Sequence, residues 1–401
     1  MLLISFLLLF LYNTSFCSVN QKELSRMDSK YIIDLDGKQE TSVPFSTYFE
    51  NAKSIILETN KDCLISDIID IQVFDGYIYL LDIRGAKSLF VFDMDGYFIR
   101  KIGRLGNGPG EYISLSNFTL DTKNKFIYLL DYFKRIHKYK LDGTFIHTIT
   151  PKLKDENIMH IQYFNSKLYL SVMAFKPSQN DYMLLEANAD NGEILSKSLP
   201  LKYNKGWAEL IFMGYNFFIP RLNNIPLYTQ MFMDYIFCIG DDIIPYIEIR
   251  SKNLVTDKDV SNISNIRGGR DMIERFQAYF RDNLKIFNIH SYIENDELIL
   301  FMYQQGLMNS YFAVANKKTG SVKLAKQLSN DIIFKSDDNH YFGGFAFYDT
   351  KGAYEILQTR SIEDFQESIR NNKVVPGLDK LDELLSLELD ANPVIFYYEY
   401  K

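Results

Sequence analysis

The sequence is poor in cysteine, with only three among its 401 residues, and it has a single tryptophan. Cys17 lies near the start. Cys63 and Cys238 stand far apart, with no second cysteine or histidine at metal-ligand spacing. This pattern excludes a disulfide-rich scaffold and suggests no zinc site. We expect Cys63 and Cys238 to be small buried residues of a fold that its core holds together.

An excess of positive charge is also absent. The chain has 44 lysines and arginines against 51 aspartates and glutamates, for a net charge of −7. Proteins that bind nucleic acid or anionic lipid generally present a basic surface, so we expect no nucleic acid partner. Apolar residues make up 47% of the chain and charged residues 24%, which is the composition of a folded globular protein.

No apolar run is long enough to span a membrane. Leu2 to Tyr12 is apolar apart from Ser5, but a spanning helix needs about 20 such residues. The run fits the apolar region of a secretory signal peptide, although no lysine or arginine precedes it. We predict a signal peptide over residues 1–17, no transmembrane helix, and export to the periplasm or cell envelope. A buried N-terminal strand is the weaker interpretation.

Two outcomes are open at the end of this peptide. Ser15 and Cys17 are small residues at the −3 and −1 positions for cleavage after Cys17, which we favour slightly. Alternatively, Cys17 is the lipidated first residue of a bacterial lipoprotein, although bulky Phe16 does not suit such a site. A lipid anchor on Cys17 would then be the only contact with a membrane. We expect a polar linker over residues 18–40.

Aromatic residues are abundant, and they occur in a repeating pattern. The chain has 28 tyrosines and 31 phenylalanines, residue types that favour β-strands. Short β-type runs recur in groups of four. Turns at Asp95-Gly96, Asp142-Gly143 and Asn191-Gly192 mark the repeat, and their glycines lie 47 and 49 residues apart. A four-stranded unit of about 40–50 residues is typical of a β-propeller blade. The period-two alternation excludes a helical solenoid.

We predict an all-β fold, a six-bladed β-propeller over residues 41–401. Three complete copies of the repeat lie between residues 68 and 199, a blurred fourth follows, and a fifth ends near Gln327. The sixth is incomplete, and we expect Ser54–Leu57 and Pro393–Tyr398 to supply its missing strands. Joining both ends of the chain in one sheet closes the ring and hides the edges of an open sheet.

Two short helical insertions interrupt the β pattern. Residues 271–284 carry Met272, Phe276, Tyr279 and Phe280 on one stripe. A second leucine stripe follows Pro376-Gly377; its members are Leu378, Leu381, Leu384, Leu385 and Leu389. We interpret both as helices that cap the propeller, with the docking of a partner as the alternative.

The string from Gly103 to Tyr112, GRLGNGPGEY, is the most distinctive motif. A nucleotide-binding interpretation fails, because the glycines of such a loop open a helix whose N-terminus faces the phosphates. Here Pro109 and Gly110 lead into another β run, and Glu111 would repel a phosphate. We expect a rigid connection between blades, built from the backbone freedom of glycine and the fixed φ of proline.

With this string the sequence resembles the six-bladed β-propeller family of exported proteins from Bacteroides-type bacteria, distantly similar to NHL-repeat propellers. The shared features are the segment Ile102 to Tyr112, Ser54 to Thr59 before the first blade, and Asn392-Pro393-Val394 near the C-terminus. The resemblance covers residues 40–401. It implies the propeller fold and an envelope location, and it provides no catalytic residues.

Alignment of the repeats places four polar residues at equivalent positions of the innermost strands: Asp70, Asn117, His160 and His290. Innermost strands of a propeller line its axial channel, so these side chains could form a ring that binds a polar ligand or a divalent metal ion. The simpler interpretation is that they hydrogen-bond to water and to one another. Blade four has Ile219 at this position, which weakens the ring.

No catalytic motif for hydrolysis is present, since the chain has neither Gly-x-Ser-x-Gly nor His-Glu-x-x-His. We therefore expect a non-catalytic binding or scaffold module for a glycan, a peptide or an envelope protein. No cofactor is predicted. The alternative is a metal-dependent hydrolase or lyase in the axial channel, with His160 and His290 binding a divalent ion.

Overall fold

The computed structural model describes residues 29–132, 134–154, 156–174, 181–207, 217–221, 225–265, 272–335 and 342–401. The predicted signal peptide, Cys17 and the first part of the predicted linker lie outside these residues. Within the described ranges, no helix is both long enough and apolar enough to cross a membrane.

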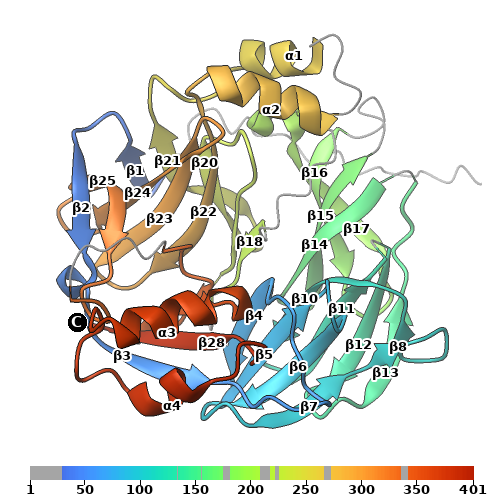
Figure 1. Cartoon of the computed structure of the whole chain (residues 1–401). Helices are drawn as coiled ribbons and strands as arrows, with labels where there is room; N and C mark the ends of the chain where they lie inside the picture. Colours follow the sequence, from blue (N-terminus) through green and yellow to red (C-terminus); the bar gives the residue numbers. More distant parts are fainter. Residues whose placement is uncertain are drawn as a thin grey trace, which may run out of the picture.

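Six sheets surround a common axis and form the six blades of a propeller, as predicted (Figure 1). In blades 1 to 3 the strands follow one another in chain order, from the axis outward. Blade 1 consists of β4 (Asp70–Phe74), β5 (Tyr77–Asp82), β6 (Ser88–Asp93) and β7 (Phe98–Ile102). Blade 2 consists of β10 (Leu115–Asp121), β11 (Phe126–Asp131), β12 (Arg135–Lys140) and β13 (Phe145–Ile149). Blade 3 consists of β14 (Glu156–Phe164), β15 (Lys167–Ala174), β16 (Tyr182–Asn188) and β17 (Ile194–Pro200).

Blades 4 to 6 each include a strand from the N-terminal part of the chain. Blade 4 consists of β18 (Phe218–Ile219), β19 (Leu227–Tyr228), β20 (Tyr235–Ile239), β21 (Ile243–Arg250) and β1 (Tyr31–Asp34). Blade 5 consists of β22 (Ile286–Glu294), β23 (Leu298–Gln305), β24 (Asn309–Asn316), β25 (Val322–Ser329) and β2 (Gln39–Pro44). Blade 6 consists of β26 (Phe347–Tyr348), β27 (Gly352–Leu357), β28 (Val394–Tyr400) and β3 (Phe49–Ile56). Short 3₁₀ helices are η1 (Phe45–Thr47), η3 (Leu201–Asn204) and η4 (Thr359–Ser361).

Blade 6 closes the ring by joining the two ends of the chain. Strand β28 pairs antiparallel with β3, in a register that sets Val394 opposite Ile56 and Phe396 opposite Ser54. The predicted source of the missing strands is therefore confirmed. The outermost strand of blade 6 thus comes from the start of the chain, and its pairing with β28 fastens the two ends of the propeller together.

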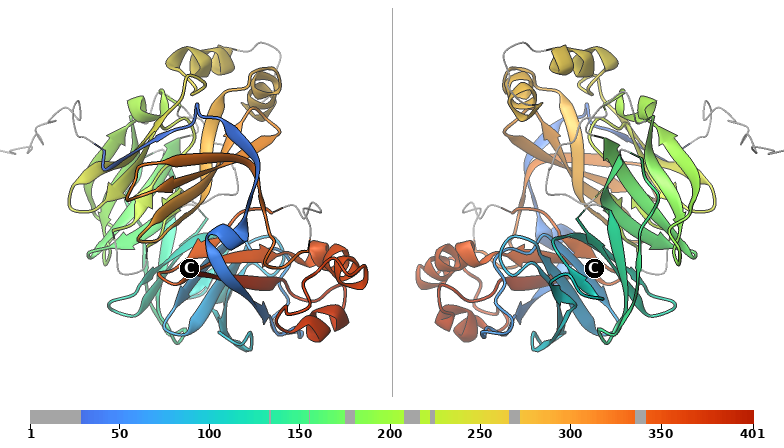
Figure 2. Two further views of the ribbon diagram at one scale, coloured as in Figure 1. Left: turned by 90° about the vertical axis from the view of Figure 1, so that its left-hand side faces the viewer. Right: turned by 90° about the vertical axis from the view of Figure 1, so that its right-hand side faces the viewer.

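The expected linker over residues 18–40 is wrong at its C-terminal end. Strands β1 and β2 add parallel fifth strands to blades 4 and 5 before β3 enters blade 6. We call residues 31–56 the N-terminal strap, because they run along the outer edges of three consecutive blades (Figure 2). A few apolar side chains of the strap pack into the blades, among them Ile33 and Phe45, which are fully buried.

The strands are apolar on both faces because each blade is packed between two neighbours. In β5, Leu80 lies in the core with Ile395 of blade 6. The next residue, Leu81, points to the opposite face and lies in the core with Leu129 of blade 2. Alternating side chains along one strand thus serve two different interfaces. This accounts for the long apolar runs in the central strands.

Both helical insertions occur where they were predicted, but each contains a second helix. The helices are α1 (Asp257–Asn265) and α2 (Met272–Asp282) between blades 4 and 5, and α3 (Ile362–Arg370) and α4 (Leu381–Ser386) within blade 6. Phe276 of α2 packs against Phe287, with ring centroids 5.1 Å apart. Phe365 of α3 packs against Phe396, with ring centroids 5.4 Å apart. The two pairs lie at separate places on the outside of the ring (Figures 1 and 2).

Candidate functional site

A cavity of about 510 Å³ lies at the propeller axis. Blades 1, 4, 5 and 6 line it through their innermost strands, β4, β18, β22 and β26, and through the segments around these strands. Its volume falls within the range of about 300–1,000 Å³ that holds small-molecule ligands. We call it the axial cavity.

A charged partition separates the axial cavity from a second cavity of about 430 Å³, which blades 1 to 4 line. Pro220 borders both cavities. Tyr292 lines the axial cavity, and its hydroxyl donates a hydrogen bond of 2.8 Å to Glu294. Glu294 also pairs with Arg221, which lines the second cavity, and with Lys317 at 2.7 Å.

Glu294 is ionised despite its burial. Burial alone opposes ionisation, but the adjacent Arg221 and Lys317 cations and the Tyr246 hydroxyl hold the pKa of Glu294 below its usual value. Removing one partner of such a buried carboxylate leaves an uncompensated charge, so its ion pairs and hydrogen bonds hold the surrounding side chains rigidly. The partition thus ties Tyr292 of the axial cavity to Arg221 of the second cavity.

Asp70 and Asn117, two members of the predicted ring, contact each other directly. The side-chain amide of Asn117 donates a hydrogen bond of 3.1 Å to Asp70, and its oxygen accepts one of 2.8 Å from the backbone N–H of Ile161. One asparagine thereby links the innermost strands of blades 1, 2 and 3. Asp70 lines the axial cavity, whereas Asn117 is buried beside it.

The two histidines of the predicted ring lie in different surroundings. His290 lines the axial cavity. His160 packs edge-on against Phe217, with ring centroids 4.5 Å apart, outside the residues that line this cavity. Burial lowers the pKa of His160 to about 3 and that of His290 to about 4. Both imidazoles are therefore neutral at pH 7.

The structure does not bring the ring together as a metal centre. Among the described residues, no group of three His, Cys, Asp or Glu side chains is placed to hold a metal ion. A catalytic metal site usually needs at least three protein ligands. Cys63 and Cys238 are free thiols and are buried, as predicted.

A β-bulge aims consecutive side chains of blade 5 into the axial cavity. The register of β22 shifts between His290 and Ile293, and Ser291 has a positive φ of 51°. As a result Ile289, His290, Ser291 and Tyr292 all line the cavity, which a regular alternating strand would not permit. Gly344 packs against the bulge so closely that a Cβ there would lie 2.1 Å from the Ser291 hydroxyl.

Two arginines lie at the rim of the axial cavity, on neighbouring blades. Arg84 follows strand β5 of blade 1 and forms an ion pair of 3.0 Å with Asp67. Arg360, in η4, is exposed and belongs to blade 6. Between them, the side chain of Gln358 bonds both backbone groups of Ile68, at 3.4 and 3.1 Å. These contacts join the last blade to the first at the cavity mouth.

The conformation of the rim depends on an aspartate that ends the second strand of blade 1. Buried Asp82 accepts hydrogen bonds from the backbone N–H groups of Ser66, Arg84, Gly85 and Ala86, at 2.8 to 3.1 Å. It thereby ties the loop before β4 to the turn after β5. Sequence reasoning missed this role, although an aspartate follows Leu-Leu in both of the first two repeats.

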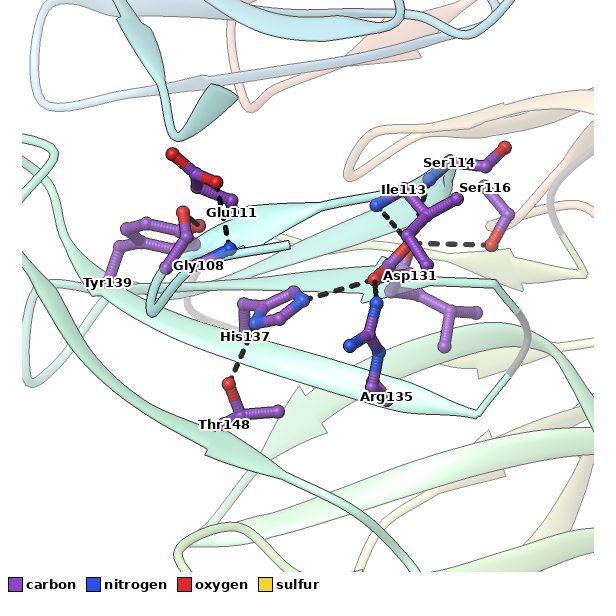
Figure 3. A network of polar contacts seen from close by, with 12 residues as sticks. Gly108, Glu111, Ile113, Ser114, Ser116, Asp131, Arg135, His137, Tyr139 and Thr148 are labelled. Carbon is purple, nitrogen blue, oxygen red and sulfur yellow. Dashed lines mark hydrogen bonds and ion pairs between the residues drawn. The ribbon is translucent and has the colours of Figure 1, made fainter. Parts of the chain in front are cut away.

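Blade 2 repeats this arrangement at Asp131 (Figure 3). Asp131 accepts backbone hydrogen bonds from Ile113 and Ser114 and pairs with Arg135. His137 lies 3.2 Å away from the same carboxylate. Burial opposes the ionisation of Asp131, but these donors hold its pKa below the usual value.

The glycine-rich string connects blades 1 and 2, as predicted. Its short strands β8 (Arg104–Leu105) and β9 (Glu111–Tyr112) pair with each other. Glu111 accepts hydrogen bonds from the backbone of Gly108 and the side chain of Arg104, at 2.8 and 2.6 Å. The Tyr139 hydroxyl donates to the carbonyl of Gly110 at 2.7 Å, next to Glu111 in Figure 3. These hydrogen bonds hold the connection together and attach it to blade 2, which indicates a structural role for the string.

Comparisons with known proteins agree with this architecture. The model of a family described as a domain of unknown function, DUF4934, matches residues 30–399. The structure of a Bacteroides fragilis protein described as exported has a TM-score of 0.71 at 17% identity, covering 92% of this chain and 99% of that chain. A DUF4221 family member from Bacteroides vulgatus gives a TM-score of 0.49 at 12% identity, covering 88% and 97%. No curated protein matches the sequence.

Proposed function

The chain belongs to the DUF4934 family, and we propose that it is an exported, non-catalytic binding module of the cell envelope. Its ligand, a glycan, a peptide or part of an envelope protein, enters the axial cavity. The propeller fold itself does not determine a function, because the same fold serves many activities. The proposal therefore depends on the site.

The observation that carries the proposal is the construction of the axial cavity. It combines a volume of about 510 Å³ with a wall in which apolar side chains such as Phe345 alternate with polar ones such as Asp70, and with two arginines at the mouth. Ligand pockets typically have this mixture, in which apolar surface provides affinity and a few polar groups fix orientation. Asp82 holds a loop of the rim in place and Glu294 holds Tyr292, which lowers the entropic cost of binding.

Export is supported by the apolar run Leu2–Tyr12 and by the exported description of the Bacteroides fragilis relative. Two mature forms are consistent with the sequence. Cleavage after Cys17 releases a soluble protein into the periplasm, whereas lipidation of Cys17 anchors it to a membrane. Mass spectrometry of the mature N-terminus from a host that exports the protein distinguishes them.

The binding function is tested on glycan and peptide arrays with the wild-type protein and a variant whose cavity is filled. Ala346 is exposed and lines the axial cavity, so Ala346→Trp blocks the space without removing a side-chain hydrogen bond. Met308→Trp is the matched control, because Met308 is 87% exposed and lies outside the cavity. We expect a ligand that binds the wild type and Met308→Trp but not Ala346→Trp. Ligands that bind all three proteins equally would place the function elsewhere.

A further inference from the structure

We infer that the axial cavity takes the end of an acidic saccharide, one that carries a single carboxylate, and that Arg360 binds this carboxylate. The inference rests on the proposed function and specifies its ligand. It follows from the charges at the cavity mouth and from the chemistry of the walls.

Arg360 is a guanidinium at the mouth with its hydrogen-bond donors available. It is exposed and lines the cavity. In the described part of the chain, no ion pair or hydrogen bond engages its side chain. Guanidinium groups bind carboxylates through two parallel hydrogen bonds and stay charged at every physiological pH. A carboxylate at the mouth therefore finds a complementary donor pair in place.

Arg84 adds a second positive charge from the neighbouring blade. Its backbone is fixed by Asp82 at 2.8 Å, and its side chain is paired with Asp67 at 3.0 Å. The Asp67 pair leaves other N–H donors of the exposed guanidinium free to contact a ligand. Asp67 offsets the charge of Arg84, so Arg360 is the guanidinium of the lining whose charge no ion pair within the described residues offsets and which can attract an anion.

The interior of the cavity limits that anion to one charge. Asp70 lies on its wall, so a second carboxylate or a dianionic phosphate placed deeper would be repelled. Neutral His290 offers no compensating positive charge. The charged end of the ligand must stay at the arginines, and the part that enters must be neutral.

The walls match a sugar ring as that neutral part. Tyr292 and Tyr348 line the cavity with the small part of each side chain that is not buried, 5% and 7% exposed, and the apolar face of a sugar ring can pack there. Ser291 and Thr229 line the cavity, and their hydroxyl oxygens can accept hydrogen bonds from ring hydroxyls. A uronic acid combines these features, since it has one carboxylate, several hydroxyls and an apolar ring face.

The test measures binding by isothermal titration calorimetry on the full chain. The probes are glucuronic acid and galacturonic acid, compared with neutral glucose and galactose. We expect the acids to bind at least about tenfold more tightly than the neutral sugars, and the difference to shrink at high salt. Arg360→Gln should lower the affinity for the acids about tenfold and leave that for the neutral sugars unchanged. Arg84→Gln should have a smaller effect, because Asp67 already occupies part of that guanidinium.

Control variants distinguish loss of the contact between Arg360 and the carboxylate from loss of a positive charge and from unfolding of the propeller. Arg370→Gln removes the same charge from an exposed position on α3 outside the cavity and should bind like the wild type. Arg360→Lys keeps the charge but not the paired donors, so it should retain only part of the affinity. Circular dichroism of each variant shows whether the propeller is intact.

Three results would overturn the inference. Equal affinity for acidic and neutral sugars, unchanged by Arg360→Gln, would leave a binding module that does not select carboxylates. Equal binding of the dipeptide alanyl-alanine and the uronic acids would show recognition of a carboxylate without a sugar. If no probe binds and Ala346→Trp alters no array ligand, the inference and the proposed function fail together.

Discussion

Glu355 of β27 is a carboxyl group in largely apolar surroundings between blade 6 and helix α3. It borders a small cavity of about 40 Å³, whose walls include Phe365 and Phe396. The Tyr398 hydroxyl donates to Glu355 at 2.6 Å and in turn accepts from Asn330 at 2.6 Å. Burial raises the pKa of Glu355 from 4.5 to about 7. This residue therefore titrates near neutral pH.

The raised pKa predicts that Glu355 makes the protein less stable as the pH increases. The folded protein keeps this proton up to about pH 7, whereas the unfolded chain releases it near pH 4.5. The stabilising contribution is therefore complete below pH 4.5 and is lost as the pH rises through 7. We expect Glu355→Gln, which cannot ionise, to be more stable than the wild type at pH 8, by up to about 3 kcal/mol.

Urea denaturation at pH 5 and pH 8 measures this effect, with Glu363→Gln as the control for an exposed glutamate on α3. The advantage of Glu355→Gln should be larger at pH 8 than at pH 5. If wild type and Glu355→Gln lose stability in parallel over this range, Glu355 is ionised in the folded protein and its surroundings are wetter than the cavity implies.

At the scale of the elements, the loops at the cavity mouth owe their conformation to the aspartate that ends a strand. Asp82 is fully buried and accepts from four backbone N–H groups. Asp93, at the end of the next strand, accepts from Asp95 and Tyr97 in an exposed turn. The two aspartates have similar local chemistry and differ in burial.

We expect Asp82→Ala to lower the unfolding free energy by about 2–4 kcal/mol, because it leaves several buried N–H groups without a partner. Asp93→Ala should cost less than about 1 kcal/mol, since water can replace its carboxylate. Hydrogen exchange should speed up around Ser66 and Arg84 only in Asp82→Ala. Similar losses in the two variants would mean that the rim loops hold their conformation without Asp82.

The elements that sequence could predict are those with a strong local pattern. Strands such as β5 and β11 are apolar on both faces and repeat at a fixed interval, so their number and order follow from the sequence. Strand β1 has only four residues, with one side chain, Ile33, fully buried. Its formation depends on the exposed edge of β21, more than 200 residues away. The local sequence of such a strand has no apolar pattern from which the strand could be predicted.

The same reasoning applies to the candidate site. The repeat alignment located Asp70 and His290 on the cavity wall, because equivalent positions of innermost strands face the axis. It could not show that Asn117 is consumed in linking three blades, or that His160 turns toward Phe217. It also gave no indication of Arg360, which comes from a non-repeating turn in the incomplete sixth blade. A repeat alignment predicts residues at equivalent strand positions, whereas the rim consists of loop residues that differ from one blade to the next.

At the scale of the whole molecule, the two halves of the ring are completed differently. Blades 1 to 3 are each continuous segments, but blades 4 to 6 all take their outermost strand from the N-terminal strap. The strap therefore spans the outer edges of three blades, and those three blades with blade 1 line the axial cavity through their innermost strands.

Neighbouring residues of β1 allow a matched test of the strap. Ile33 is fully buried against blade 4, whereas Ile32 is 47% exposed on the opposite face of the same strand. We expect Ile33→Ala to cost about 2–4 kcal/mol of unfolding free energy, as buried isoleucine truncations do, and Ile32→Ala to cost less than about 0.5. In β21 the Ile249 amide donates to Asp234 within blade 4, so the neighbouring amides of Glu248 and Arg250, opposite Ile32 and Asp34, face β1. Exchange of these two amides should accelerate only in Ile33→Ala. If both variants are as stable as the wild type and β21 stays protected, β1 adds nothing to blade 4, and the strap is held by its strands β2 and β3 alone.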